Sequence, residues 1–255
     1  MARQWFGKLR AATRAVGLGA CTASIVHGHG LLARVGLVGW EREDKAPWIR
    51  AWGHLMFPIL GVRLRLVEGS APPDGTYLVV ANHRSPIDIL IAMHLIGGCV
   101  LSHEGVADLP IMGDAARATD TIFVDRADPR SGFKAIRAIR RRLEQGQNVI
   151  VFPEGTTYPG DEVRPFKRGS FTAARGLAEV RVLPLGLAYP PGAEFFDETF
   201  PAHLTRVGSR TWTPVWAVIG EPHEVPRSAE DEEALRAAVQ RLVDRAAAAR
   251  DAAAR

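Results

Sequence analysis

The 255-residue chain has only two cysteines, Cys21 and Cys99, and they stand far apart. Two isolated thiols make neither a disulfide framework nor the closely spaced ligand pairs of a zinc site. His27 and His29 form a pair too short and isolated to indicate a metal ligand set. We therefore expect no metal, and we expect the cysteines to be ordinary thiols in a chain consistent with a reducing compartment.

Long apolar runs are also missing. Residues 15–40 are apolar on average, but His27, His29, Arg34 and several glycines interrupt them. A membrane-spanning helix usually needs about 18 or more consecutive apolar residues. The sequence therefore predicts against a spanning helix and against an ordinary signal peptide at this end.

Three further absences exclude classes of protein. The chain has no Gly-x-Ser-x-Gly elbow, which a serine-type lipid hydrolase would need. Nothing in it resembles a nucleic-acid-binding module, although the net charge is +4. There is no internal repeat, and no linker long enough to mark a second folded domain. The apolar fraction of 47% is sufficient for one hydrophobic core.

Positive charge is concentrated at the amino end. The first 65 residues carry ten basic side chains against three acidic ones, interleaved with tryptophan and phenylalanine. Such a pattern is typical of helices that lie among lipid headgroups. We predict a helical membrane-associating segment over residues 1–58, with an amphipathic helix pair packed on the domain as the alternative.

From residue 59 onward, apolar runs alternate with helical periodicity, which indicates an α/β fold with helices on both faces of a mixed, largely parallel sheet. One folded domain is predicted over residues 59–255. Strands are expected at 62–67, 77–81, 99–101, 121–124, 148–152, 180–189 and 215–219. Helices are expected at 86–96, 111–118, 131–145, 171–178 and from 228, with residues 190–214 irregular.

The first chemically informative motif follows the predicted strand at 77–81. In Asn82-His83-Arg84-Ser85-Pro86-Ile87-Asp88, a histidine stands five residues before a carboxylate. Asp88 is explained in part as a helix cap, with Ser85 as the N-cap. That explanation leaves His83 unaccounted for. Asp88 can also orient one ring nitrogen of His83, which frees the other to accept a proton.

A second motif, Phe152-Pro153-Glu154-Gly155-Thr156, follows the strand at 148–152. On its own it could be a tight turn. Cations surround it in the sequence, however, at Arg126, Lys167 and Arg168. A carboxylate with several cations at one sheet edge suits a phosphate beside hydroxyl groups, while a solvated surface is the alternative for Lys167 and Arg168.

At this point the sequence resembles the 1-acylglycerol-3-phosphate O-acyltransferase family. Four family blocks occur in order: Asn-His-x4-Asp at residues 82–88, Ile-Phe-Val-x-Arg at 122–126, Phe-Pro-Glu-Gly-Thr at 152–156 with Phe-Lys-Arg-Gly at 166–169 behind it, and an approximate Val-Pro block at 182–185. The resemblance covers roughly residues 60–190 and implies that the domain predicted over residues 59–255 is an acyltransferase domain.

The resemblance implies that His83 is a general base oriented by Asp88. It implies that the co-substrate is an acyl-CoA or acyl carrier protein thioester, that there is no other cofactor, and that the acceptor is a lysolipid. It also implies a location at the cytoplasmic face of the cell membrane. The substrate-contacting residues that it implies, with Arg126 and Lys167 on phosphate, are Asn82, Ser85, Arg126, Glu154, Gly155, Thr156, Lys167 and Arg168.

Three departures from the family pattern concern the acceptor. Thr157 stands where many members have arginine, Asp120 stands where many have glycine, and a lysine before the second block has no counterpart. Lysophosphatidate is the first acceptor expected, and another lysolipid, including one with an amino-acid head group, stays open. A lipid-binding protein of the same fold without catalysis is the further alternative.

Overall fold

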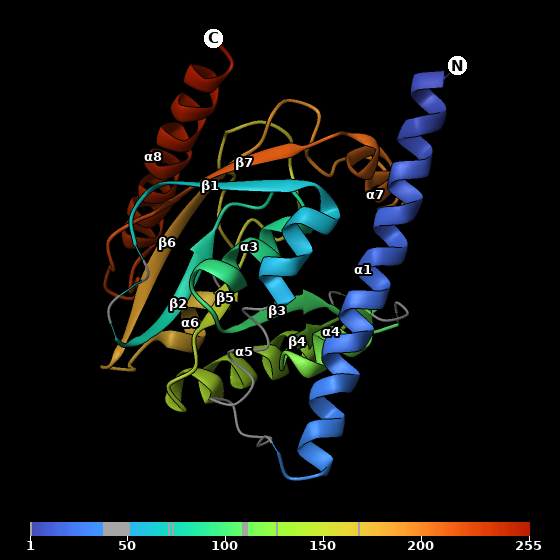
Figure 1. Cartoon of the computed structure of the whole chain (residues 1–255). Coiled ribbons are helices and arrows are strands. Elements are labelled where there is room, and N and C mark those ends of the chain that lie inside the picture. Colours follow the sequence, from blue (N-terminus) through green and yellow to red (C-terminus); the bar gives the residue numbers. More distant parts are fainter. Residues whose placement is uncertain are drawn as a thin grey trace.

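The computed structural model describes residues 2–37, 52–70, 72, 74–108, 112–125, 127–167 and 169–255 (Figure 1). Its centre is a seven-stranded sheet with the order β1-β7-β6-β2-β5-β3-β4. The strands are β1 Val62–Glu68, β2 Thr76–Ala81, β3 Cys99–His103, β4 Ile122–Val124, β5 Val149–Val151, β6 Val180–Ala188 and β7 Thr213–Ile219.

Strand direction confirms the predicted mixed, largely parallel sheet. β6, β2, β5, β3 and β4 pair in parallel. β7 is antiparallel to β6, and β1 is parallel to β7. The central strands are apolar along their whole length because helices cover both of their faces.

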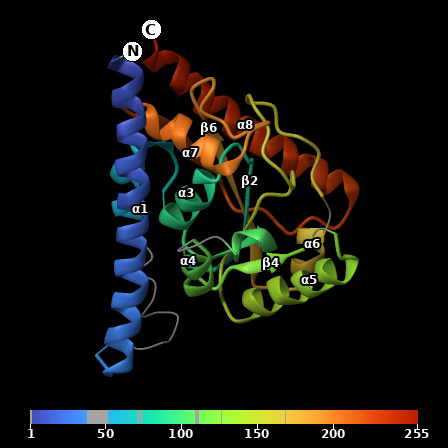
Figure 2. The same cartoon turned by 90° about the vertical axis from the view of Figure 1, so that its right-hand side faces the viewer.

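Helices form the two outer layers (Figure 2). α3 Ile87–Leu95, α4 Met112–Ala118 and α7 Phe200–Ser209 cover one face together with helical residues 52–60. α5 Pro129–Glu144, α6 Gly169–Ala174 and α8 Ala229–Ala253 cover the other. Trp52, Met56 and Phe57 are part of the first layer's core, so the predicted boundary at residue 58 falls inside a helix that packs into the domain.

Two local predictions are wrong. Residues 190–214, predicted to be irregular, contain α7, which Thr199 caps by accepting a hydrogen bond from the Ala202 N–H. The predicted helix cap at Ser131 is instead Asp128, because Pro129 starts α5 one turn earlier. Ser131 uses its hydroxyl to accept from the Asp125 N–H at 2.8 Å.

The amino end is one continuous helix, α1 Ala2–Arg34, with no single apolar stripe. Contrary to the sequence expectation, its stretch Trp5–Leu32 is long and apolar enough to cross a membrane by length and composition alone. A core helix or a signal sequence would pass the same test, but only 12% of the apolar window is buried in the structure. The interruptions that argued against a span lower the local hydropathy without breaking the helix. Trp40 and Trp48 lie outside the described residues.

Candidate functional site

The predicted site residues gather where three neighbouring strands end. His83 follows β2, Glu154 follows β5, and Tyr189 follows β6, and these three strands are adjacent and parallel. The carboxyl ends of parallel strands are where α/β sheets bind ligands, because the loops there are free of ladder hydrogen bonds. Figure 1 shows β2, β5 and β6 side by side.

His83 and Asp88 form a dyad. The His83 Nδ1 lies 2.9 Å from the Asp88 Oδ2, and the Asp88 side chain is fully buried while that of His83 is 17% exposed. A carboxylate partner holds the proton on Nδ1, so Nε2 carries the free lone pair. The ring stacks on Phe152 with centroids 4.2 Å apart and planes at 20°, which fixes its orientation.

The buried carboxylate of Asp88 is fully hydrogen-bonded. Its Oδ2 also accepts from the Arg84 N–H at 2.5 Å and the Ser85 N–H at 2.8 Å. The N-cap of α3, however, is Pro86 and not Ser85 as predicted, because the helix begins at Ile87. Its Oδ1 accepts from the Tyr189 hydroxyl at 2.6 Å. Burial, and then the charge of Asp88, raise the pKa of Tyr189 well above its ordinary value, so this hydroxyl remains a donor. The dyad is thus held by a residue 101 positions away.

Glu154 is not exposed toward a substrate in this structure. It is 3% exposed, and its Oε1 accepts from the His83 N–H at 2.7 Å while its Oε2 accepts from the Arg164 N–H at 2.9 Å. Arg84 Nη1 lies 3.0 Å from Oε1, and both side chains of this ion pair are buried. The structure therefore shows Glu154 holding the backbone of the turn between β2 and α3, which carries His83.

Arg84 ties the same turn to the loop that follows Glu154. Its Nε donates to the Gly160 carbonyl at 2.6 Å, its Nη2 to the Glu162 carbonyl at 2.7 Å, and its Nη1 to the His83 carbonyl at 2.8 Å. A guanidinium can satisfy this many acceptors at once because its donors point outward in a fixed plane. Arg84 was not among the predicted site residues.

The remaining residues of the second motif lie at the surface of the site. Gly155 has a φ of +79°, and a Cβ there would meet the Lys167 side chain at 2.6 Å, so this position requires glycine. Thr156 and Lys167 are exposed. Arg126 and Arg168 lie outside the described residues, and their predicted contacts with substrate stay predictions.

Asn82 and Ser85 are completely buried and bonded within the protein. The Asn82 amide donates to the Leu187 carbonyl and accepts from the Leu187 N–H, both at 2.8 Å, which extends the pairing of β2 with β6. The Ser85 hydroxyl lies 3.1 Å from Nε2 of His203 on α7. A direct contact of either side chain with substrate stays a prediction, and the structure gives both a positioning role.

His203 continues this network away from the dyad. Its Nδ1 lies 2.9 Å from Glu198 Oε1, and Arg206 pairs with the same carboxylate. The chain Glu198–His203–Ser85 therefore ends against the backbone that binds Asp88. Sequence reasoning missed Tyr189 and His203, since no periodicity or spacing links them to residues a hundred or more positions earlier. Only the cap at Thr199 marked the helix that carries His203.

Replacing Ser85 with alanine tests whether this residue positions the turn or contacts substrate. The change leaves Nε2 of buried His203 without its partner, which is expected to lower the free energy of unfolding by about 1–3 kcal/mol. The acceptor KM should stay within about twofold of wild type, because no substrate contact is lost. Chemical denaturation and steady-state kinetics measure the two effects. An increased acceptor KM at unchanged stability would show instead that Ser85 binds substrate.

Mild acid should destabilise the fold through histidines whose pKa folding lowers. Burial lowers the pKa of His94, His203 and His223 below the ordinary 6.5. Below about pH 6.5 the unfolded chain therefore binds more protons than the folded one, and stability falls as pH falls through this window. Melting temperatures at pH 7 and pH 5 should differ less in His203→Gln than in wild type. His27→Gln, an exposed control, should keep the wild-type difference; an unchanged difference in His203→Gln would contradict the assignment.

Comparison with known proteins relates the central part of the chain to one family. Residues 65–188 match the family model described as Acyltransferase. Those residues are an acyltransferase-family domain. The match contains β2 to β6 and hence His83, Asp88, Glu154 and the whole of the turn between β2 and α3.

Curated relatives of this domain carry two kinds of name. A lyso-ornithine lipid O-acyltransferase of Rhizobium meliloti (strain 1021) is 33% identical over 157 residues, which are 59% of this chain and 53% of the relative. A 1-acyl-sn-glycerol-3-phosphate acyltransferase of Neisseria gonorrhoeae is 32% identical over 150 residues, 59% of this chain and 52% of the relative. The chain spans about half the length of these curated relatives.

One solved structure resembles the whole fold. The crystal structure of the 1-acyl-sn-glycerophosphate (LPA) acyltransferase PlsC from Thermotoga maritima aligns with a TM-score of 0.69 and 26% identity. The alignment covers 95% of both chains, so it extends beyond the acyltransferase domain.

Proposed function

We propose that this chain is an O-acyltransferase that moves a fatty acyl group from an acyl thioester to a hydroxyl of a lysolipid. The observation that carries the proposal is the dyad: buried Asp88 holds His83 Nδ1, and Nε2 has no hydrogen-bond partner among the described residues. The acyltransferase-family match and the PlsC-like fold support the same reaction class.

In the proposed mechanism, Nε2 of His83 takes the proton of the acceptor hydroxyl as its oxygen attacks the thioester carbonyl. Asp88 stabilises the imidazolium that forms. The tetrahedral intermediate then collapses, the carbon–sulfur bond breaks, and the imidazolium returns its proton to the leaving thiolate. The products are an ester and a free thiol, and the enzyme regains its starting protonation state.

Two acceptors deserve the first tests. Lysophosphatidate is proposed because several relatives and the solved neighbour are named as acyltransferases of 1-acyl-sn-glycerol-3-phosphate. A lyso-ornithine lipid is the second candidate, since three relatives carry that name and Thr157 offers no charge for a phosphate monoester. In both cases the donor is an acyl-CoA or acyl carrier protein thioester.

We also propose that α1 lies on the membrane and does not cross it, at the cytoplasmic face. Large apolar side chains on and just after α1 are uncovered, among them Trp5, Phe6, Val16 and Leu31. The same helix is fastened to the domain: Arg10 donates to the Ser209 carbonyl, and Arg14 donates to the carbonyls of Gly208, Arg210 and Thr211 at 2.6–2.9 Å. A helix bonded along its first half to a folded domain is suited to one leaflet.

The experiment is an acceptor panel. Detergent-purified protein is incubated with a long-chain acyl-CoA or acyl carrier protein thioester and with lysophosphatidate, lyso-ornithine lipid or other lysolipids. New diacyl lipids are identified by mass spectrometry, and His83→Ala serves as the inactive control. Phosphatidate supports the first acceptor, and an acylated ornithine lipid supports the second. Lipid binding without any turnover, unchanged in His83→Ala, would overturn catalysis in favour of a binding protein.

A further inference from the structure

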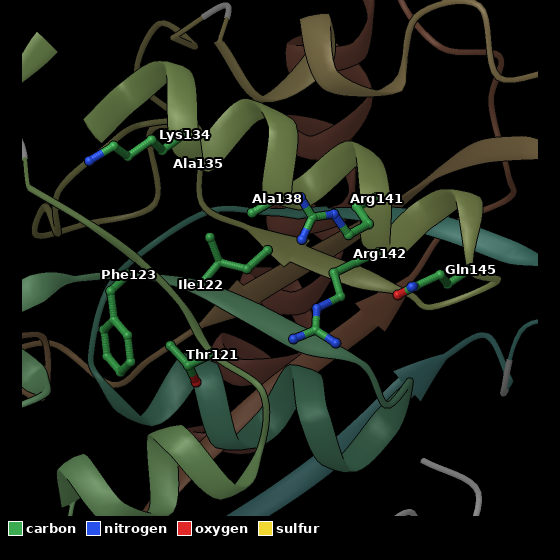
Figure 3. Close-up of a pocket in the computed structure, with 9 residues that line it drawn as sticks. All are labelled: Thr121, Ile122, Phe123, Lys134, Ala135, Ala138, Arg141, Arg142 and Gln145. Carbon is green, nitrogen blue, oxygen red and sulfur yellow. The ribbon is translucent and has the colours of Figure 1, made fainter. Parts of the chain in front are cut away.

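A cavity of about 450 Å³ lies away from His83, between the edge strand β4 and α5 (Figure 3). One wall is strand residues 121–123, and the other is a single face of α5 that runs from Lys134 to Gln145. β4 is the last strand of the sheet, so this cavity opens at the sheet's edge.

The charged groups that line the cavity are all positive: Lys134, Arg141 and Arg142. Arg142 lies 3.6 Å from the Asp120 carboxylate. Within the part of the chain that the structure describes, the side chains of Lys134 and Arg141 make no ion pair or hydrogen bond. Cations that line a hollow and outnumber the acids beside it attract an anion, because the protein walls focus their field.

The donor groups suit phosphate in particular. Guanidinium groups bind phosphate oxygens through paired N–H donors, and an ammonium group adds a point charge. Figure 3 shows that all three cations come from α5, with Arg142 pointing toward the strand, Lys134 pointing away from the two arginines, and Gln145 at the far end. These side chains are spaced along the helix, so the cavity can contact more than one phosphate group.

Its place in the fold relates the cavity to the dyad. β4 is three strands away from β2 in the order β2-β5-β3-β4, which is about 14 Å at the usual strand spacing. α5 starts beyond the carboxyl end of β4, so Lys134 lies nearer the catalytic end of the sheet than Gln145 does. A ligand in the cavity would therefore need a flexible arm to reach His83. In acyl thioesters of coenzyme A and of acyl carrier protein, a pantetheine arm separates the phosphate from the thioester.

We propose that the Lys134–Arg141–Arg142 cavity binds the phosphate groups of the acyl donor. This inference rests on the proposed acyltransferase function and names the second substrate's binding site. The phosphate belongs either to coenzyme A or to the phosphopantetheine group of a carrier protein.

The test compares two double variants on one helix. Lys134→Gln/Arg141→Gln removes two cations that line the cavity. Arg130→Gln/Arg137→Gln removes two cations of α5 that do not line it, and so controls for net charge. Binding of coenzyme A without an acyl group is measured by calorimetry, which requires no turnover. KM is measured separately for the acyl donor and the acceptor.

For the cavity variant, the Kd of coenzyme A and the donor KM should rise about tenfold or more, because hydrogen bonds to charged groups are lost. kcat, the acceptor KM and all values for the control variant should change little. Wild type should bind an acyl-dephospho-coenzyme A or an acyl-pantetheine more weakly than it binds the intact acyl-coenzyme A. The cavity variant should bind these donors about as well as the intact one. If only carrier-protein thioesters show the effect, the phosphate is that of the carrier.

Three results would overturn the proposal: equal losses in both double variants, an increase in the acceptor KM alone, or no binding of either donor by wild type. Failure of the proposed function is a separate outcome. Wild type could bind coenzyme A and yet acylate no lysolipid. If the cavity variant then binds coenzyme A at least about tenfold more weakly than wild type, the cavity assignment stands and the proposed reaction does not.

Discussion

Replacing His83 with alanine is expected to lower kcat for acyl transfer by about 10²–10⁴-fold, the usual contribution of a positioned general base. The loss follows because no other group in the described dyad can accept the hydroxyl proton: Asp88 is fully buried and already accepts four hydrogen bonds. The measurement is initial rate at saturating donor and acceptor.

The fold should survive this change. The His83 backbone keeps its bonds to Glu154 and Tyr158, and the lost ring is partly exposed. Melting temperature should therefore stay near that of wild type. His27→Ala, which removes an exposed histidine of α1, should retain full activity. Wild-type turnover by His83→Ala would contradict the general-base assignment.

Neutralising Glu154 should have the largest effect on stability. Glu154→Gln leaves the buried guanidinium of Arg84 without a counter-charge, and breaking a buried ion pair from one side typically costs about 3–5 kcal/mol. It also weakens the acceptor for the His83 N–H, so activity should fall as the turn between β2 and α3, which carries His83, loosens. Urea denaturation gives the free energy of unfolding, and the same samples give the rate.

A double-mutant cycle separates the ion pair from other effects. Arg84→Met combined with Glu154→Gln should lose less stability than the sum of the single variants, because the second change removes the unpaired charge. The exposed pair Asp114–Arg117 is the matched control, and Asp114→Asn should cost at most about 1 kcal/mol. Full additivity at Arg84 and Glu154 would show that they are not energetically coupled.

Local signals were sufficient for most of the elements. The apolar runs that predicted strands at 62–67, 77–81, 180–189 and 215–219 correspond to β1, β2, β6 and β7 within one or two residues. The capping box predicted at Ser228 with Asp231 is present at the start of α8. These features depend on neighbours along the chain, and strand and helix periodicities record them directly. The alternation of the two element types predicted the α/β sheet for the same reason.

The sequence by itself thus determined the class of fold, the end of the sheet where the motifs gather, and the pairing of His83 with Asp88, five residues apart. Only the tertiary structure decided what surrounds them. Glu154 became a buried partner of Arg84, Tyr189 and His203 entered the network from β6 and α7, and α1 was bonded to the α7 end of the domain. These contacts join residues 70 to 196 positions apart. Packing of whole elements creates them, and no local pattern in the chain encodes which buried polar groups will meet.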